Sequence, residues 1–512
     1  MFSLYYDTEL RNVFWKHKHD GKLVKDLTDP DVNHDLDQEI VDKLIDHKFH
    51  TFDESVIPKT TWDGLHDYQR DGVKFIVKHG GRALIADQMG TGKTRQAIVA
   101  SLYYKDDFPV IIVCPASLCQ NWKNEISNVC DYTVQVIKKT SDSISPKSKF
   151  IILSYGKLIS QKFLAVLCKV YWPFVIMDEC HYVKNAKSQR TKVAMKLCAN
   201  AKRVLALSGT PMNKPKDIYS ISKCVCPKLF TRFYSEHGKA FHFSNRYCNP
   251  RKQHFSGGNP VDHSGSARPE ELNAILKYTM LLCRTKDEVM TLPEKIRETV
   301  TIGENPPSWL KNNKAYLAKV REESKLLHDA KFMNMVMETS KKKTKFTIGF
   351  FKTILLKRME EDESLKVIIF GNYIQNLTAI SEFFATTFEE SPYNFITIDG
   401  RTPVMKRQDM VDKFQNDPLC RVAVLGIKAC GAGLTLTAAS QVYMTDMMFN
   451  PEDCLQAEDR AHRHGQDSHV TITYLIMGGS TDQMLFDMIS RKFTVCSQVI
   501  ENKKRKLEVI NR

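Results

Sequence analysis

A glycine-rich loop between a short apolar run and a helical pattern constrains this chain more than any other segment. The apolar run is Ala83-Leu84-Ile85-Ala86, and the loop reads Asp87-Gln88-Met89-Gly90-Thr91-Gly92-Lys93-Thr94. When such a loop connects a strand to a helix, the backbone N–H groups of the loop and of the helix N-terminus converge and can bind an anion. The sequence therefore predicts a phosphate-binding loop (P-loop).

The loop residues predict distinct contacts with a nucleotide. Gly90 and Gly92 let the backbone approach phosphate oxygens, Lys93 supplies a positive charge, and the Thr94 hydroxyl is suited to bind Mg²⁺. All eight residues are predicted to bind the cofactor. Asp87 departs from the strict pattern, which has Gly at that position. A chance glycine-rich turn is the competing interpretation, and the flanking strand and helix patterns argue against it.

Two adjacent acids follow another predicted strand. The strand is Phe174–Met177, and the acids are Asp178 and Glu179. Neighbouring strand side chains point in opposite directions, so Asp178 is predicted to hold Mg²⁺ with Thr94 while Glu179 orients and deprotonates a water. Such a pair alone is usually an exposed loop. Its position about ninety residues after the P-loop favours nucleotide hydrolysis.

Short β-branched runs alternate with helical patterns in two separate series. This rhythm predicts βαβ units and parallel sheets with helices on both faces. We therefore expect an α/β fold of two domains separated by a helical insertion. The expected strands are Pro109–Cys114, Phe150–Leu153, Phe174–Met177 and Val204–Leu207 in the first series, and Lys366–Phe370, Phe395–Ile398, Arg421–Leu425, Val442–Thr445 and Val470–Leu475 in the second.

The two strand–helix series, with the segments before, between and after them, predict five parts. They are an N-terminal extension (1–60), a first lobe (61–223), an irregular and helical insertion (224–360), a second lobe (361–490) and a basic C-terminal tail (491–512). The tail contains Lys503-Lys504-Arg505-Lys506. We interpret it as a solvated tail, with nuclear import or phosphate contact as the alternatives.

Composition narrows the class of partner. The chain has 512 residues, of which 42% are hydrophobic and 26% charged, as in ordinary globular proteins. Its net charge of +15 favours a polyanion, and nucleic acid is the commonest candidate. No apolar run approaches the ~18 residues that a membrane span needs, so we expect no membrane partner. The 14 cysteines are scattered and indicate thiols in a reducing compartment.

A third charged segment, Gln456 to Gln466, lies in the second domain and contains Arg460 and Arg463. These arginines are predicted to lie one helical turn apart on a shared helix face. Their planar, permanently charged groups suit the charge that develops on a γ-phosphate. Supplied from a second domain, they would raise the rate by on the order of 10³–10⁵ and make hydrolysis depend on domain closure. A surface ion-pair helix is the alternative for this segment taken alone.

Together these segments resemble the ordered motifs of superfamily-two helicase-like ATPases, and more narrowly of SWI/SNF-type DNA translocases. The resemblance covers roughly residues 62–490 and implies two RecA-like lobes around ATP. It places Gln69, within Leu65-His66-Asp67-Tyr68-Gln69, on the adenine base. It also implies that Ser208–Pro211 couples nucleotide state to the lobes, and that Gly431–Thr437 touches both the DNA backbone and the ATP cleft.

Within this family the sequence is most similar to the annealing-helicase (HARP-type) branch. Leu65–Trp122, Arg246-Tyr247-Cys248 and Asp262–Ser266 carry that similarity, with Ala438-Ala439-Ser440. It implies an ATP-dependent translocase on double-stranded or forked DNA that rewinds or remodels forks and repair intermediates, with ATP and Mg²⁺ as cofactors. Contacts to DNA phosphates would be sequence-independent. The expected location is the nucleus, with a viral replication compartment in the host cell as the alternative.

Other hypotheses stay open. A strand-separating helicase would carry a different third motif, such as Ser-Ala-Thr, and a chromatin remodeller usually carries long appendages. A non-catalytic ATP-gated DNA clamp would not need Lys93, Asp178 and Glu179 together with the two arginines. Gln88 stands where the family usually has an acid, and residues 1–60 contain no convincing HARP module. Substrate targeting and protein partners are therefore not assigned.

Overall fold

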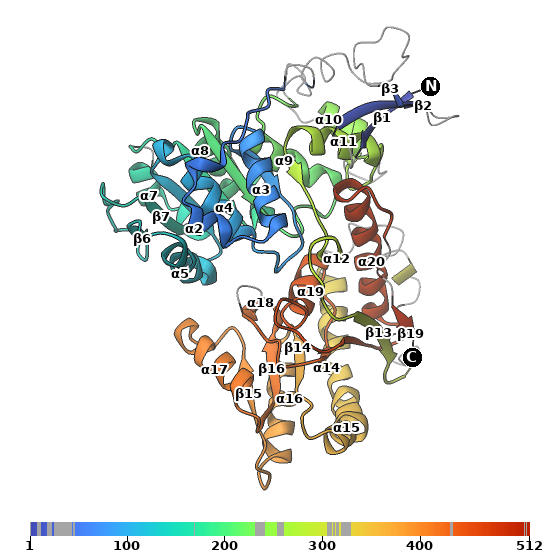
Figure 1. Cartoon of the computed structure of the whole chain (residues 1–512). Coiled ribbons are helices and arrows are strands. Elements are labelled where there is room, and N and C mark those ends of the chain that lie inside the picture. The colour runs from blue at the N-terminus through green and yellow to red at the C-terminus, as the bar shows by residue number, and fades with distance from the viewer. Residues whose placement is uncertain are drawn as a thin grey trace. The chain divides into compact units, whose positions relative to one another are not determined.

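The computed structural model divides the chain into two compact units (Figure 1). Unit 1 comprises Met1–Met290 and Thr494–Arg505, and unit 2 comprises Thr291–Phe493 and Lys506–Arg512. The structure describes residues 2–7, 12–17, 23–24, 44, 47–167, 169–230, 241–252, 261–304, 310, 313, 317–318, 329–430, 434–505, 507 and 509–511. Each unit contains a seven-stranded parallel sheet, which confirms the predicted α/β fold of two lobes.

The sheet of unit 1 has the strand order β12-β4-β9-β8-β5-β7-β6, and its neighbouring strands are parallel. The predicted strands of the first series are all present, and β6 and β12 are additions at the two edges. The bounds are β4 (Arg82–Ile85), β5 (Val110–Cys114), β6 (Val134–Val136), β7 (Phe150–Ser154), β8 (Phe174–Asp178), β9 (Arg203–Leu207) and β12 (Leu281–Leu282).

Helices cover both faces of this sheet (Figure 1). α3 (Asp67–Lys78), α4 (Lys93–Tyr103) and α5 (Cys119–Val129) pack on one face, and α6 (Tyr155–Leu158), α8 (Gln189–Ala199) and α9 (Pro215–Val225) on the other. The central strands are buried on both sides, which explains why β5 is a continuous apolar run without polar alternation. Each fully buried aliphatic side chain of such a strand contributes about 1.5–3 kcal/mol.

The sheet of unit 2 has the order β15-β16-β14-β17-β18-β13-β19 and is also parallel. The strands of the second predicted series are all present. The strand bounds are β13 (Lys295–Thr301), β14 (Val367–Gly371), β15 (Asn394–Ile398), β16 (Cys420–Gly426), β17 (Gln441–Met444), β18 (Val470–Ile476) and β19 (Ile510–Asn511). The main helices are α14 (Ala330–Phe350), α15 (Leu356–Glu361), α16 (Ile374–Thr387), α17 (Val404–Asn416), α19 (Pro451–Glu458) and α20 (Thr481–Ile500). Among the described helices, none is both long and apolar enough to cross a bilayer.

The predicted insertion, residues 224–360, is not a separate part, because the two units divide it between them. Its first portion supplies unit 1 with the edge strand β12 and with α10 (Phe241–Tyr247), α11 (Pro269–Thr279) and α12 (Lys286–Val289). Its second portion supplies β13, α14 and α15 to unit 2. The strands were missed because β12 has two residues and β13 is rich in charge, so neither shows the apolar pattern of a central strand.

The predicted boundary at residue 490 also differs from the structure, whereas the Lys503 and Lys504 side chains are exposed, as expected of a solvated basic run. α20 continues to Ile500, and Val499 and Ile500 are buried in the core of unit 1. The Asn273 side-chain amide donates to the carbonyls of Val499 and Ile500 at 2.8 and 3.0 Å. Lys503, in the basic run, forms an ion pair with Glu288. Apolar burial therefore folds this segment back onto the protein.

The N-terminal part contains a small antiparallel sheet of β1 (Phe2–Asp7), β2 (Asn12–His17) and β3 (Leu23–Val24). Most other residues before position 47 lie outside the described residues. The described chain resumes with Phe49 and Phe52, whose rings contact Tyr278 and Trp62 in unit 1. Aromatic packing thus attaches the end of the predicted extension to unit 1.

Candidate active site

The P-loop connects β4 to α4, as the sequence predicts. Gly90 and Gly92 have φ angles of 85° and 75°, a region that favours glycine. Gly92 is the N-cap of α4 and no side chain caps this helix end. The first backbone N–H groups of α4 therefore stay available to an anion.

The lysine of the P-loop lies against the loop backbone. Lys93 Nζ donates to the carbonyl oxygens of Asp87 and Gln88 at 2.8 and 3.1 Å. An ammonium group has three donors, so this arrangement leaves one for a phosphate oxygen. The loop is further closed by the Thr91 hydroxyl, which donates to the Gln88 carbonyl at 2.9 Å. The positive charge and the glycines together fit a nucleotide phosphate.

Gln69 lies at the start of α3 and contacts the P-loop directly. Its Nε2 donates to the Thr91 carbonyl at 3.2 Å, and its Oε1 accepts from the His66 backbone N–H at 3.2 Å. A Cβ atom at Gly92 would come within 2.2 Å of Gln69 Nε2, so only glycine permits this approach. The structure joins the predicted base-reading residue to the phosphate loop, and the contact to adenine stays a prediction.

Asp178 ends β8 and is buried. Its Oδ2 accepts from Trp122 Nε1 at 2.7 Å, and its Oδ1 accepts from the Glu179 backbone N–H at 2.9 Å. Burial, with the neighbouring Glu179 charge, raises the pKa of the Asp178 carboxyl to about 6. The Lys93 charge opposes this rise, so the P-loop lysine and the first acid lie close enough to interact. The structure thus brings two of the predicted site residues together.

Glu179 has φ 50° and ψ 54°, a left-handed conformation that is uncommon for residues other than glycine. Its Oε2 accepts from Ser208 Oγ at 3.3 Å and lies 3.2 Å from His181 Nδ1. The Thr210 backbone N–H donates to Ser208 Oγ at 3.3 Å. Such strain is typical of functional sites. The contacts connect the predicted catalytic base to the Ser208–Pro211 segment.

The predicted magnesium ligands are Thr94, at the start of α4, and Asp178. The described residues contain no group of three or more His, Cys, Asp or Glu side chains that would hold a metal by themselves. Mg²⁺ commonly takes one or two protein oxygens and completes its octahedron with phosphate oxygens and water. The residues present therefore fit Mg²⁺ that arrives with a nucleotide, and this role stays a prediction.

Arg460 and Arg463 do not share a helix face, and this expectation is wrong. α19 ends at Glu458, and both arginines lie in the turns that follow. Beyond the helix end, the Arg460 carbonyl accepts from the Leu436 backbone N–H at 3.0 Å, which ties this turn to the preceding segment. The two guanidinium groups nevertheless converge, since each donates to the Leu434 carbonyl at 3.4 Å. Residues 431–433 of the Gly431–Thr437 segment lie outside the described residues.

Gln466 holds these turns against the preceding segment. Its Nε2 donates to the carbonyls of Thr437, Ala439 and Ala461 at 3.1, 3.0 and 3.1 Å. One side-chain amide thus replaces the backbone ladder that a helix would have provided. The convergence of the arginines is a tertiary feature and not a product of helical spacing.

Sequence reasoning missed Glu458, a buried acid that anchors the arginine segment. Arg297 NH2 lies 2.6 Å and Lys295 Nζ 3.2 Å from Glu458 Oε2, and the Tyr474 hydroxyl donates to Oε1 at 2.7 Å. Burial acts to raise the pKa of the Glu458 carboxyl, but the charges of Arg297 and Lys295 outweigh it and hold the pKa at about 2. The clustered charge on β13 was the only clue in the sequence.

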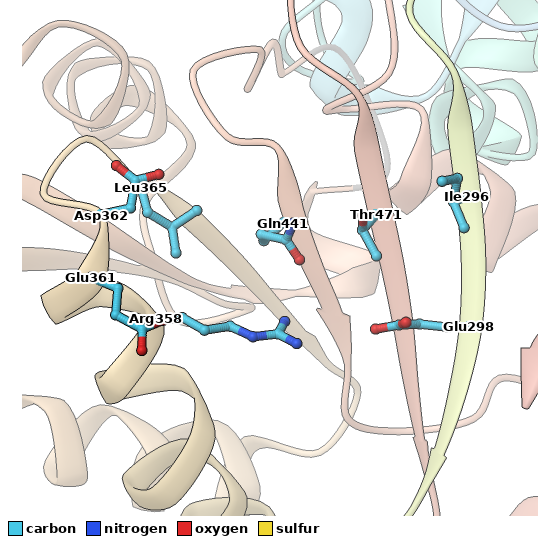
Figure 2. Close-up of a pocket in the computed structure, with 8 residues that line it drawn as sticks. All are labelled: Ile296, Glu298, Arg358, Glu361, Asp362, Leu365, Gln441 and Thr471. Atoms are coloured by element: carbon cyan, nitrogen blue, oxygen red, sulfur yellow. The ribbon is translucent and has the colours of Figure 1, made fainter. Parts of the chain in front are cut away.

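A hollow of about 410 Å³ lies elsewhere in unit 2, beside β13, β17, β18 and α15 (Figure 2). In Figure 2 the Arg358 side chain extends from α15 toward Gln441 and Glu298 on the strands. The hollow is lined by Ile296, Glu298, Arg358, Glu361, Asp362, Leu365, Gln441 and Thr471. None of the predicted nucleotide residues or paired arginines is among them, so this hollow is distinct from both sets.

Two protein families match the chain. The SNF2-related domain matches residues 68–364, and the helicase conserved C-terminal domain matches residues 350–465. The chain belongs to the SNF2-related family. The P-loop and the Asp178–Glu179 pair fall within the first match, and both arginines fall within the second.

Curated relatives support the same placement. The DNA annealing helicase and endonuclease ZRANB3 of Mus musculus is 32% identical, over 87% of this chain and 41% of the relative. The SWI/SNF-related matrix-associated actin-dependent regulator of chromatin subfamily A-like protein 1 homolog of Caenorhabditis elegans is 33% identical, over 87% of this chain and 63% of the relative. The chain therefore spans less than two thirds of either protein. These matches confirm the predicted similarity to the annealing-helicase branch.

A similar solved structure is the Sulfolobus solfataricus SWI2/SNF2 ATPase core in complex with dsDNA. Its sequence is 24% identical to this chain, its TM-score is 0.41, and the match covers 89% of this chain and 96% of that one.

We expect Glu458→Gln to lower the free energy of unfolding of unit 2 by about 3 kcal/mol at pH 7, because Arg297 loses its buried counter-charge and Lys295 keeps only Asp459. The pKa is depressed in the folded state, from 4.5 to about 2, so the contribution of the carboxylate is full above pH 4.5. It is lost as the pH falls from 4.5 toward 2. Native-state hydrogen exchange of the β13 and β18 amides measures this change in the free energy of unfolding. Glu360→Gln, at an exposed position, is the control, and equal protection in the two variants would contradict the prediction.

Proposed function

We propose that this chain is an ATP-dependent double-stranded DNA translocase of the annealing-helicase type, which couples ATP hydrolysis to rewinding or remodelling of DNA. One observation carries the proposal. Unit 1 presents a P-loop with Lys93 beside a buried Asp178–Glu179 pair, and unit 2 presents two arginines that converge on one carbonyl. These are the groups that phosphoryl transfer requires.

The residues of unit 1 would bind the nucleotide and prepare the water. Lys93 and the N-terminus of α4 would bind phosphate oxygens, and Thr94 and Asp178 would hold Mg²⁺. The metal, when bound, neutralises phosphate charge. Glu179 would orient the attacking water and accept its proton. Ser208 donates to the Glu179 carboxylate, so it would hold that carboxylate in one orientation.

The residues of unit 2 would supply the remaining charge. Arg460 and Arg463 carry fixed positive charges, and the Leu434 carbonyl partly balances both of them. Such arginines are worth on the order of 10³–10⁵ in rate when they reach the γ-phosphate. Hydrolysis would then require both units, which is how nucleotide turnover would be coupled to movement along DNA.

Double-stranded DNA is the proposed partner, with forks and repair intermediates as the specific substrates. The net charge of +15 favours a polyanion, and ZRANB3 is named a DNA annealing helicase. Contacts to phosphates carry no sequence information, so binding would be independent of sequence and weakened by salt. A nuclear location follows as a proposal from this substrate.

We expect Lys93→Ala and Glu179→Gln each to abolish ATP turnover while DNA binding is largely retained. Lys93 would bind phosphate and Glu179 would activate water, and neither role involves DNA. Phosphate release with and without duplex DNA measures turnover, and a gel shift measures binding. Lys105→Ala, at an exposed position of unit 1, is the control. Near-normal turnover in either variant would show that the site is wrongly assigned.

Arg460→Ala and Arg463→Ala test the contribution of unit 2. We expect kcat to fall on the order of 10³-fold in each variant, while the equilibrium affinity for ATP changes little, because the arginines act on charge that develops during transfer. Arg491→Ala removes a cation from α20 and is the control. If both arginine variants keep the kcat of the control, unit 2 does not take part in hydrolysis.

A forked or bubble-containing duplex distinguishes the proposed activity from its alternatives. We expect ATP-dependent closure of the unpaired region, visible as a mobility change on a native gel, and no closure by Glu179→Gln. Separation of the strands would instead indicate a strand-separating helicase. ATP-dependent DNA binding without phosphate release would indicate a clamp.

A further inference from the structure

A segment that follows α11 continues the sheet of unit 1 into the P-loop. The Ala86 backbone N–H donates to the Leu282 carbonyl at 2.6 Å, and the Gln88 N–H donates to the Arg284 carbonyl at 3.0 Å. The Gln88 side-chain Oε1 accepts from the Lys286 backbone N–H at 3.0 Å. Three hydrogen bonds therefore fix the entrance of the P-loop to a segment that lies almost two hundred residues later in the sequence.

The Arg284 side chain adds an ion pair at the same place. Its Nε donates to Asp87 Oδ1 at 3.0 Å, and its NH2 group contacts Asp87 Oδ2. Its NH1 group donates to the Tyr68 carbonyl. Gln96, on α4, accepts from Arg284 NH2 and donates to Asp87 Oδ2, both at 3.3 Å. One guanidinium group thus joins the P-loop, the base-reading segment and α4.

The Arg284–Asp87 pair is buried, so the loss of either partner would leave a buried charge without its counter-charge. The Asp87 side chain is fully buried, and that of Arg284 is 15% exposed. A buried carboxylate without a partner costs several kcal/mol, whereas a two-pronged arginine pair supplies both charge and fixed geometry. Asp87 occupies the position where the strict P-loop pattern has Gly. The chain therefore carries a buried charge in its phosphate loop, and the ion pair that compensates it comes from Arg284, 197 residues later in the sequence.

We propose that Arg284 is a positioning residue for the nucleotide. It sets the placement of the P-loop relative to the segment Leu65–Gln69, so that one nucleotide can contact both its phosphate groups and its base. The inference rests on the proposed function and assigns to that site a residue outside its motifs. The hydrogen bonds of Arg284 go to Asp87, Tyr68 and Gln96, which are not assigned to the chemical step, so its loss is expected to affect binding of ATP more than that step.

A second arginine pair in unit 1 provides a matched comparison. Arg246 Nε and NH2 donate to Glu271 Oε1 and Oε2 at 2.7 and 2.8 Å. The two arginine side chains are similarly exposed, 17% for Arg246 and 15% for Arg284, whereas Glu271 is 15% exposed and Asp87 is fully buried. Arg246 lies on α10 and Glu271 on α11, and this ion pair includes no residue of the P-loop. Arg246→Ala therefore removes a comparable ion pair without disturbing the nucleotide residues.

The test compares Arg284→Ala, Arg284→Lys and Arg246→Ala in the full chain. We measure kcat and KM for ATP with duplex DNA, equilibrium binding of a fluorescent ATP analogue, and Tm. Arg284→Ala is expected to raise KM and the dissociation constant roughly tenfold or more, the equivalent of lost charged hydrogen bonds. Its kcat stays within about threefold of wild type. Arg284→Lys keeps the positive charge but loses the two-pronged hydrogen bonding of the guanidinium group. Its KM and dissociation constant are therefore expected to lie between those of wild type and Arg284→Ala.

Two results would overturn the role of Arg284 in positioning the nucleotide. If Arg284→Ala and Arg246→Ala lower Tm alike and neither changes KM or the dissociation constant, Arg284 is only structural and the inference is overturned. A fall in kcat at unchanged KM also overturns it. If Arg284→Ala does not fold, Arg284→Lys decides by the same criteria. If the wild type binds but does not hydrolyse ATP, the proposed function fails, and the binding titration still tests Arg284.

Discussion

Two buried carboxylates hold the functional loops of this protein, and each is neutralised by an arginine from the same stretch of chain. Asp87 in the P-loop pairs with Arg284, and Glu458, just before the paired arginines, pairs with Arg297. A buried carboxylate is unfavourable unless such a partner and further hydrogen bonds are present. The geometry of the P-loop and of the segment that carries Arg460 and Arg463 therefore depends on residues 284–297.

The same stretch contains the boundary between the two units. Unit 1 ends its main segment at Met290, and unit 2 begins at Thr291. Before the boundary the chain adds β12 to the sheet of unit 1, and after it the chain adds β13 to the sheet of unit 2. The connection is thus anchored on each side by strand pairing and by a buried ion pair.

Within unit 1 the chemistry is concentrated where the backbone is least relaxed. Gly92 is left-handed at the start of α4, and Glu179 is left-handed directly after β8. Glycine adopts this conformation without cost, whereas Glu179 requires support from its surroundings. Ser208 and His181 contact its carboxylate and provide that support. The left-handed turn thus places Glu179 directly after the end of β8, next to Asp178.

Much of the fold and part of the site could be predicted from sequence, because their causes are local. The central strands of both sheets are buried on both faces and therefore appear as continuous apolar runs, as in β5 and β14. The P-loop and the Asp178–Glu179 pair follow such strands directly, so their position relative to the sheet was evident. The expected helical register of Arg460 and Arg463 was wrong, since periodicity cannot reveal a tertiary bond to Leu436.

The sequence by itself determined the two α/β lobes, the phosphate loop and the adjacent acids, since short-range patterns of apolar residues and glycine specify them. Only the tertiary structure decided the edge strand β12, the strand β13, the folded C-terminal segment and the partners of Asp87 and Glu458. A charged residue on a short strand has the same local pattern whether it faces water or a buried counter-ion. Its partner lies more than a hundred residues away in the chain, and only folding brings the two charges together.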